Sequence, residues 1–172
     1  MDAPAGDPRP LEPGDAVAAL YDRFGLALYR TARTLLNHSH LAEDAVQETF
    51  VGLVRAGVAP TDLDNARAYL FAALRHAAAK IALRPGAGRR VALPDLDALA
   101  APQPPAPPSC AGLERALAAL PAEQRELIAL KIDGGLTFQE VAACLGISPN
   151  TAASRYRYAL AKLRDALRGA DR

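Results

Sequence analysis

The stretch TFQEVAACLGISPNTAASRYRYALAKLRDALR, residues 137–168, decides the fold of this chain. It opens on a T-x-x-E capping box at Thr137, in which two side chains bond backbone donors at a helix start. Gly146 stands where a helix stop requires a positive φ. Ser148 and Pro149 then give a second start signal, an N-cap followed by the residue favoured at the first helical position. The stretch predicts a short helix, a tight turn and a longer helix.

The second of these helices carries cations, and the combination is typical of a helix-turn-helix motif. Such a motif lays its second helix in the major groove of DNA, which is wide enough to admit one. The pattern therefore points to nucleic acid as the target.

Composition and charge agree with a helical protein that has separate binding surfaces. The 172 residues are 51% hydrophobic but only 5% aromatic, with Ala and Leu dominant, which favours helices over strands. The net charge is +1, yet residues 1–50 sum to −4, residues 51–90 to +5 and the last sixty residues to +2. An acidic surface suits a protein partner, and a basic one suits phosphates.

Prolines divide the chain. Six of them fall between Pro94 and Pro108, and proline blocks helix continuation. We therefore predict an all-α protein of two small helical domains joined by a Pro/Ala-rich linker, the C-terminal domain being the helix-turn-helix. The predicted parts are a disordered tail at 1–13, a first domain at 14–84, the linker at 85–111 and a second domain at 112–172. Helices are expected at 16–36 (capped by Asp15), 41–57, 66–83, 113–120 and 121–132, ahead of residues 137–168.

Several function classes are not indicated. No apolar stretch is long enough to span a membrane, and the acidic, proline-rich N-terminus resembles no signal peptide, so a cytoplasmic location without membrane insertion is expected. Cys110 and Cys144 form no disulfide framework, and Cys144 is expected in the core; a redox role for Cys110 stays open. No catalytic constellation, metal site or cofactor motif is recognised, so an enzyme is not expected.

The helix with the segment AEDAVQETF, residues 42–50, is the next most specific feature. Leu53 and Val54 are expected to face a core, whereas Asp44 and Glu48 share the opposite flank with their polar neighbours. Alone, such a flank is an ordinary solvated face. Beside a helix-turn-helix and a proline linker, it favours a docking surface.

The AEDAVQETF segment and the C-terminal LPAEQRELIALKIDGGLTFQEVAACLGISPNTAASRYRYALAKLR together resemble bacterial sigma factors of the compact extracytoplasmic-function (ECF) group of the sigma-70 family. The resemblance covers about residues 14–84 and 112–168. It implies a factor that binds core RNA polymerase and directs promoter-specific initiation. Core RNA polymerase, promoter DNA and an anti-sigma factor are the partners implied.

The resemblance also assigns residues to roles. Polymerase binding falls to Asp44, Gln47, Glu48 and Phe50. Opening and capture of the minus-ten element fall to Asp62, Asp64, Asn65, Arg67, Arg75, Lys80 and Arg84. Contacts with the minus-thirty-five element fall to Asn150, Thr151, Ala153, Ser154, Arg155, Arg157 and Tyr158. Arg157 can present a bidentate fork to guanine.

The chain departs from the family at some of these positions. Ala153 stands where a basic residue is usual, and the third helix has Tyr69-Leu70 where the family has Trp-Leu. These departures make minus-ten melting less secure than minus-thirty-five binding. They leave an alternative interpretation, in which the chain is a stand-alone helix-turn-helix DNA-binding regulator that no longer works with polymerase. A module that binds other proteins rather than DNA is the remaining alternative.

Overall fold

The computed structural model describes residues 13–57, 65–85 and 108–170, and in these ranges every regular element is a helix. The all-α prediction is confirmed. The elements are α1 (Pro13–Leu36), α2 (Ser39–Arg55), α3 (Ala66–Ala82), α6 (Pro108–Ala118), α7 (Ala122–Ile128), the π-helical turn η2 (Ala129–Asp133), α8 (Phe138–Leu145) and α9 (Pro149–Ala170). We call α1 to α3 the N-terminal module and α6 to α9 the C-terminal module.

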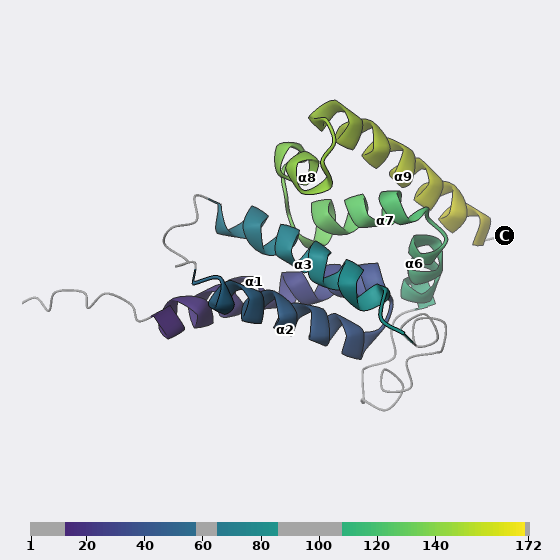
Figure 1. Cartoon of the computed structure of the whole chain (residues 1–172). Helices are drawn as coiled ribbons and strands as arrows, with labels where there is room; N and C mark the ends of the chain where they lie inside the picture. Colours follow the sequence, from purple (N-terminus) through teal and green to yellow (C-terminus); the bar gives the residue numbers. More distant parts are fainter. Residues whose placement is uncertain (1–12, 58–64, 86–107, 171–172) are drawn as a thin grey trace, which may run out of the picture.

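The N-terminal module is a three-helix unit in which α1, α2 and α3 pack on one another (Figure 1). Gly57 follows α2 with φ of 62°, the conformation expected at a helix stop. Asn65 caps α3, because its side chain accepts a hydrogen bond from the Ala68 N–H at 2.9 Å. The prediction that Asp15 caps the first helix is wrong. The helix begins at Pro13, so Asp15 lies in its first turn, where its negative charge interacts favourably with the helix dipole.

The C-terminal module differs from the prediction at two boundaries. Helix α6 begins at Pro108, inside the stretch expected as linker, because proline is compatible with a first helical turn. The single helix expected at 121–132 is instead α7 followed by η2, with Pro121 as N-cap. In η2 the Gly134 N–H bonds Ala129 O at 3.0 Å, which widens the last turn.

The two modules lie against each other. Figure 1 shows the C-terminal helices stacked over α1 and α3, and α1 packs on η2 and α7 while α3 packs on α8. Leu28 and Phe71 of the N-terminal module share one buried cluster with Leu130, Leu136 and Val141 of the C-terminal module. The predicted pair of linked domains therefore has a common core in this structure.

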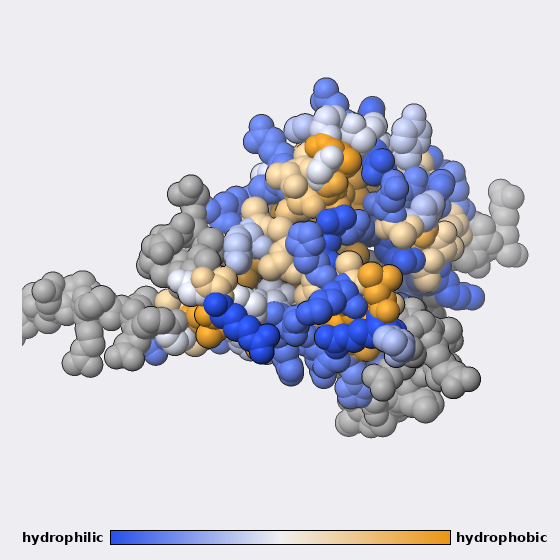
Figure 2. Space-filling view, in the orientation of Figure 1, coloured by the Kyte–Doolittle hydropathy of each residue, from blue (hydrophilic) through white to orange (hydrophobic). Residues whose placement is uncertain are grey.

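The outer surface on the side shown in Figure 2 is largely hydrophilic, with small apolar patches between the polar side chains. No helix in the described ranges is both long and apolar enough to cross a membrane.

Candidate polymerase and promoter interfaces

The helix-turn-helix is built by the local signals read from the sequence. Thr137 Oγ1 accepts from the Glu140 N–H at 3.2 Å, and Glu140 Oε2 accepts from the Thr137 N–H at 2.6 Å. Gly146 ends α8 with φ of 65°, and Ser148 Oγ accepts from the Thr151 N–H at 3.0 Å at the start of α9. The capping box, the glycine stop and the serine cap are all confirmed.

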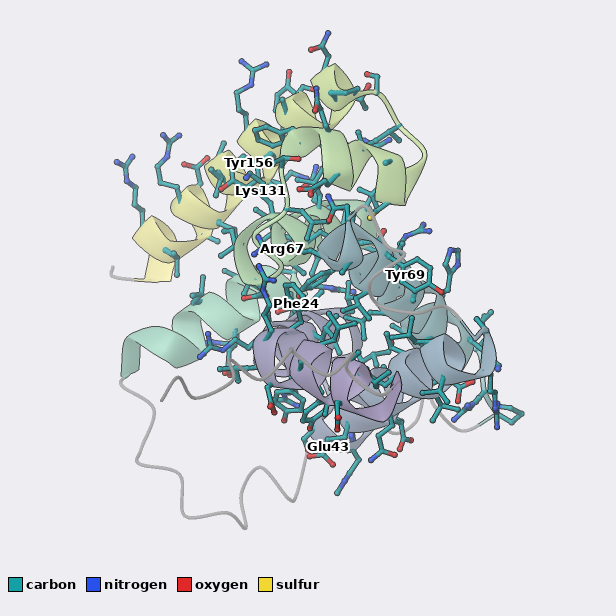
Figure 3. All side chains as sticks on the ribbon, turned by 90° about the vertical axis from the view of Figure 1, so that its left-hand side faces the viewer. Phe24, Glu43, Arg67, Tyr69, Lys131 and Tyr156 are labelled. Carbon is teal, nitrogen blue, oxygen red and sulfur yellow. The ribbon has the colours of Figure 1, made fainter. Side chains whose placement is uncertain are left out.

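Aromatic contacts hold α9 against the rest of this motif. The rings of Phe138 and Tyr156 meet edge to face with centroids 5.5 Å apart, and Lys131 Nζ lies 5.1 Å from the Phe138 centroid. Such contacts add roughly 0.5–1.5 kcal/mol each beyond burial. Figure 3 shows Tyr156 and Lys131 close together on the C-terminal module. The orientation of α9 is therefore fixed by packing before any DNA is bound.

The predicted minus-thirty-five residues fall into two groups on α9. Asn150, Arg157 and Tyr158 are exposed, whereas Thr151, Ala153, Ser154 and Arg155 are half-buried. Arg155 Nη1 lies 2.9 Å from Glu123 Oε2 on α7, and the Ser154 hydroxyl donates to Thr151 O at 3.0 Å. The side chains free to project into a groove are thus mainly those of the first group.

The acidic flank of α2 is exposed at Asp44 and Gln47. Glu48 is half-buried, with Oε1 3.1 Å from Lys80 Nζ of α3. The hydrogen bond and the charge of Lys80 lower the pKa of Glu48. Figure 3 shows the neighbouring Glu43 on the side of the molecule away from the C-terminal module.

Phe50 does not lie on this surface. It is only 8% exposed and its ring meets that of Tyr21 edge to face at 5.3 Å. The aromatic ring open to a partner is that of Tyr21, which is 56% exposed. Phe50 therefore lies beneath Tyr21 in this structure, and its part in polymerase binding stays a prediction.

Two valines extend the α2 surface. Val51 is 41% exposed and Val54 is 62% exposed, so the expectation that Val54 faces the core is wrong. Val51 follows Gln47 by four residues and Val54 follows Val51 by three, which places all three on one helical stripe. That spacing was available in the sequence, but apolar side chains at such positions are assigned to a core by default.

The predicted minus-ten residues that the structure describes are largely engaged. Asn65 Nδ2 donates to Glu140 Oε1 at 2.5 Å, Arg67 Nη1 donates to Gly135 O at 3.0 Å, and Arg75 Nε donates to Glu126 Oε1 at 2.7 Å. All three acceptors belong to the C-terminal module. Lys80 bonds Glu48, Arg84 is exposed, and Asp62 and Asp64 lie outside the described residues.

Two carboxyl groups at the junction of the modules have shifted pKa values. The Thr137 backbone and the Asn65 amide lower the pKa of Glu140. Burial raises the pKa of Asp133, an effect opposed by the Thr34 hydroxyl that donates to it at 3.0 Å.

Burial also raises the pKa of the half-buried Cys144 thiol, as expected for a core cysteine, while the Cys110 side chain lies outside the described residues. Within the described ranges no three His, Cys, Asp or Glu residues are grouped to hold a metal ion.

Comparisons with known proteins cover both modules. Residues 20–84 match sigma-70 region 2, and residues 111–163 match sigma-70 region 4. The chain is 35% identical over 156 residues to the ECF RNA polymerase sigma factor SigL of Mycobacterium tuberculosis. The matched stretch covers 85% of this chain and 85% of that protein. It is 32% identical over 148 residues to the ECF sigma factor SigE of Mycolicibacterium smegmatis, covering 81% of this chain and 57% of that protein.

A solved structure extends the likeness to the fold. CnrH in complex with the cytosolic domain of CnrY matches with a TM-score of 0.66 at 27% identity, covering 91% of this chain and 89% of that one. The capped helix-turn-helix, the three-helix unit with its acidic flank, and relatives that span both modules lead to one conclusion. The chain belongs to the ECF sigma factors of the sigma-70 family, non-catalytic proteins that bind core RNA polymerase and direct promoter-specific initiation.

Proposed function

We propose that the stripe formed by Asp44, Gln47, Val51 and Val54 on α2, together with Tyr21, is the surface that docks on core polymerase. Its support is that one carboxylate and one amide, those of Asp44 and Gln47, are exposed beside three exposed apolar or aromatic side chains, those of Val51, Val54 and Tyr21. An acidic rim steers association with a basic partner, and apolar side chains at its centre supply most of the affinity. Glu48 lies at the edge of this surface and is held by Lys80.

The first half of α9 reads the minus-thirty-five element. The observation that carries this assignment is the exposure of Asn150, Arg157 and Tyr158 on a helix whose N-terminus is capped and whose axis is fixed by Phe138 and Tyr156. Arg157 suits a guanine edge, and the N-terminus of α9 suits a phosphate. Thr151 and Ser154 add shorter polar contacts at the rim.

The start of α3 and the residues before it engage the minus-ten element. Arg67, Arg75 and Lys80 lie on α3, which Asn65 caps, so these three cations can follow a phosphate backbone once they are free. The N-terminal domain at 14–84 and the C-terminal domain at 112–172 are the functional units, with α6 extending the second. The protein works in the cytoplasm, where the polymerase is.

An anti-sigma factor regulates the chain. The support is the solved CnrH structure, which contains the cytosolic domain of CnrY. A partner of this kind would cover α2 or α9 and so compete with polymerase or promoter.

Selection of promoter DNA by reconstituted holoenzyme tests the whole assignment. We expect core polymerase to co-purify with the chain, and selected promoters to share an upstream element whose recognition changes in Arg157→Ala. Binding must also weaken steeply between two salt concentrations, because phosphate contacts release counterions. Selection of DNA without any shared upstream element would contradict the assignment of α9.

A further inference from the structure

A cleft between the end of α1 and the helices α6 and α7 has both charged and apolar walls. Arg33 and Asn37 line it from α1 and the residue after it, and Glu114, Leu117 and Arg125 line it from the C-terminal module. Its volume is about 310 Å³, at the lower end of the range for small-molecule sites. None of these side chains has a role in the proposed function. We call this space the head cleft.

Two arginines give the head cleft its chemical character. Arg33, in the last turn of α1, and Arg125, on α7, are both half-buried. Arg125 Nη1 donates a hydrogen bond to Ala118 O at 3.1 Å. A guanidinium has five N–H donors in a planar fork, so this bond fixes the group and leaves donors for a carboxylate or a phosphate. The carboxylate of Glu114 is exposed, where solvent screens its charge.

A smaller cavity of about 170 Å³ continues from the head cleft, and we call it the tail cleft. Leu35 and Arg125 line both spaces, which makes them neighbours. The other walls of the tail cleft are mainly short apolar side chains, those of Ala78, Ala79, Ala82 and Ala122 beside Leu36. Its two charged residues, Arg75 and Glu126, form an ion pair with Nε and Oε1 2.7 Å apart, so their charges largely cancel. This second space therefore suits an apolar group.

We propose that the head cleft and the tail cleft together bind a small amphipathic anion, a carboxylate or phosphate on a short aliphatic chain. The anionic head lies between Arg33 and Arg125, and the chain extends into the tail cleft. Across the two clefts three arginines stand against two carboxylates, which favours an anion over a cation. The alanine walls leave a narrow space, which favours a chain over a wide ring system.

Such a ligand contacts both modules, since Arg33 belongs to α1 and Arg125 to α7. It binds the folded chain and not the unfolded one, so the thermal midpoint of unfolding rises with its concentration. The chain thus responds to a small molecule at a place apart from the α2 stripe and from the exposed side chains of α9.

Titration of the full chain with octanoate and with octyl phosphate tests the proposal and distinguishes the two head groups. Ligand-detected NMR measures the dissociation constant, and thermal unfolding gives an independent readout. Octan-1-ol has the chain without the charge, and acetate has the charge without the chain. We expect at least one of the two anions to bind at least about tenfold more tightly than octanol and acetate, because hydrogen bonds to charged groups are the stronger ones. Each methylene removed should weaken binding by up to about fourfold while it lies in the tail cleft.

Three substitutions test the head cleft. Arg125→Gln removes the fork and should weaken binding of the anion by about tenfold or more. Arg125→Lys keeps the charge without the planar fork, so its affinity should fall between those of wild type and the Gln variant. Glu114→Gln on α6 removes a like charge near the head group and should strengthen binding by up to about twofold, since that carboxylate is exposed.

Ala79→Leu tests the tail cleft. Ala79 lines the cleft from an exposed position on α3, so a larger side chain can fill the space without disturbing the core. We expect binding of octanoate to weaken by about tenfold or more, as removal of its buried methylenes would. Ala19→Leu is the matched control, because Ala19 is an exposed alanine of α1 that lines neither cleft.

The absence of saturable binding by either anion would overturn the proposal. So would octanol binding as tightly as octanoate, unchanged affinity in Arg125→Gln or Ala79→Leu, or an equal loss in Ala19→Leu. Failure of the wild type to bind polymerase or promoter DNA, with binding of the anion intact, would instead count against the proposed function alone.

Discussion

Arg155 of α9 forms an ion pair with Glu123 of α7, with Nη1 and Oε2 2.9 Å apart. The cation that the family resemblance assigns to DNA is therefore bound by a carboxylate of the same module. The Glu123 side chain is 71% exposed and that of Arg155 is 35% exposed, so water screens the pair and its strength is modest.

Glu123→Gln should release Arg155 toward phosphate. We expect the affinity for a minus-thirty-five duplex to rise by up to about fivefold, because an exposed ion pair contributes about 0.2–1 kcal/mol. The slope of affinity against salt concentration should steepen, since one more cation reaches the backbone. Titration of labelled duplex at several salt concentrations measures both quantities. A rise no larger than in Glu114→Gln would mean that Arg155 serves only to hold α9 on α7.

Arg157→Ala should weaken promoter binding by about 1–3 kcal/mol and relax discrimination at one position of the upstream element. The reason is that Arg157 is exposed and has the fork geometry that recognises guanine. Arg168→Ala is the matched control, because Arg168 is an exposed cation in the last turn of the same helix. There its charge interacts favourably with the helix dipole. If both variants lose affinity equally for all duplexes, Arg157 is a phosphate contact rather than a base reader.

Thr137→Ala should destabilise the C-terminal module by about 1 kcal/mol, because it leaves the Glu140 N–H at the start of α8 without its side-chain acceptor. Urea unfolding of the full chain measures the loss. Thr137→Ser keeps the hydroxyl and should retain most of the stability. A Thr137→Ala protein as stable as the Ser variant would show that packing by Val141 alone holds the helix start.

Local signals predicted the helix-turn-helix well, because the capping box, the glycine at positive φ and the serine cap each act between residues no more than four positions apart. Burial was harder to predict from the sequence, because Tyr21 and Val54 are apolar but exposed, and Phe50 is covered by Tyr21. The contacts between the modules could not be predicted from patterns in the sequence. Arg75 and Glu126 are 51 residues apart, and no periodicity relates their helices.

Asp133→Asn should stabilise the packed chain at neutral pH. Burial raises the pKa of Asp133, so its carboxylate is ionised at a cost in the folded chain, whereas Asn still accepts from the Thr34 hydroxyl without a charge. A raised pKa means that the folded chain holds the proton more tightly than the unfolded chain does. The wild type therefore loses stability as pH rises from the ordinary value of 3.8 to the raised pKa, and the penalty is constant above it.

Urea unfolding of both proteins across acidic to neutral pH measures this effect. The difference in unfolding free energy between Asp133→Asn and wild type should be smallest at the acid end and grow with pH to a plateau. Glu140 has a lowered pKa, so the stability that its carboxylate contributes to the folded chain is lost as pH falls below 4.5. This loss is common to both proteins and cancels in the difference. Thr34→Val, which removes the donor, should enlarge the penalty of the wild-type carboxylate. A difference independent of pH would mean that Asp133 is solvated in solution and that α1 and η2 are not packed there.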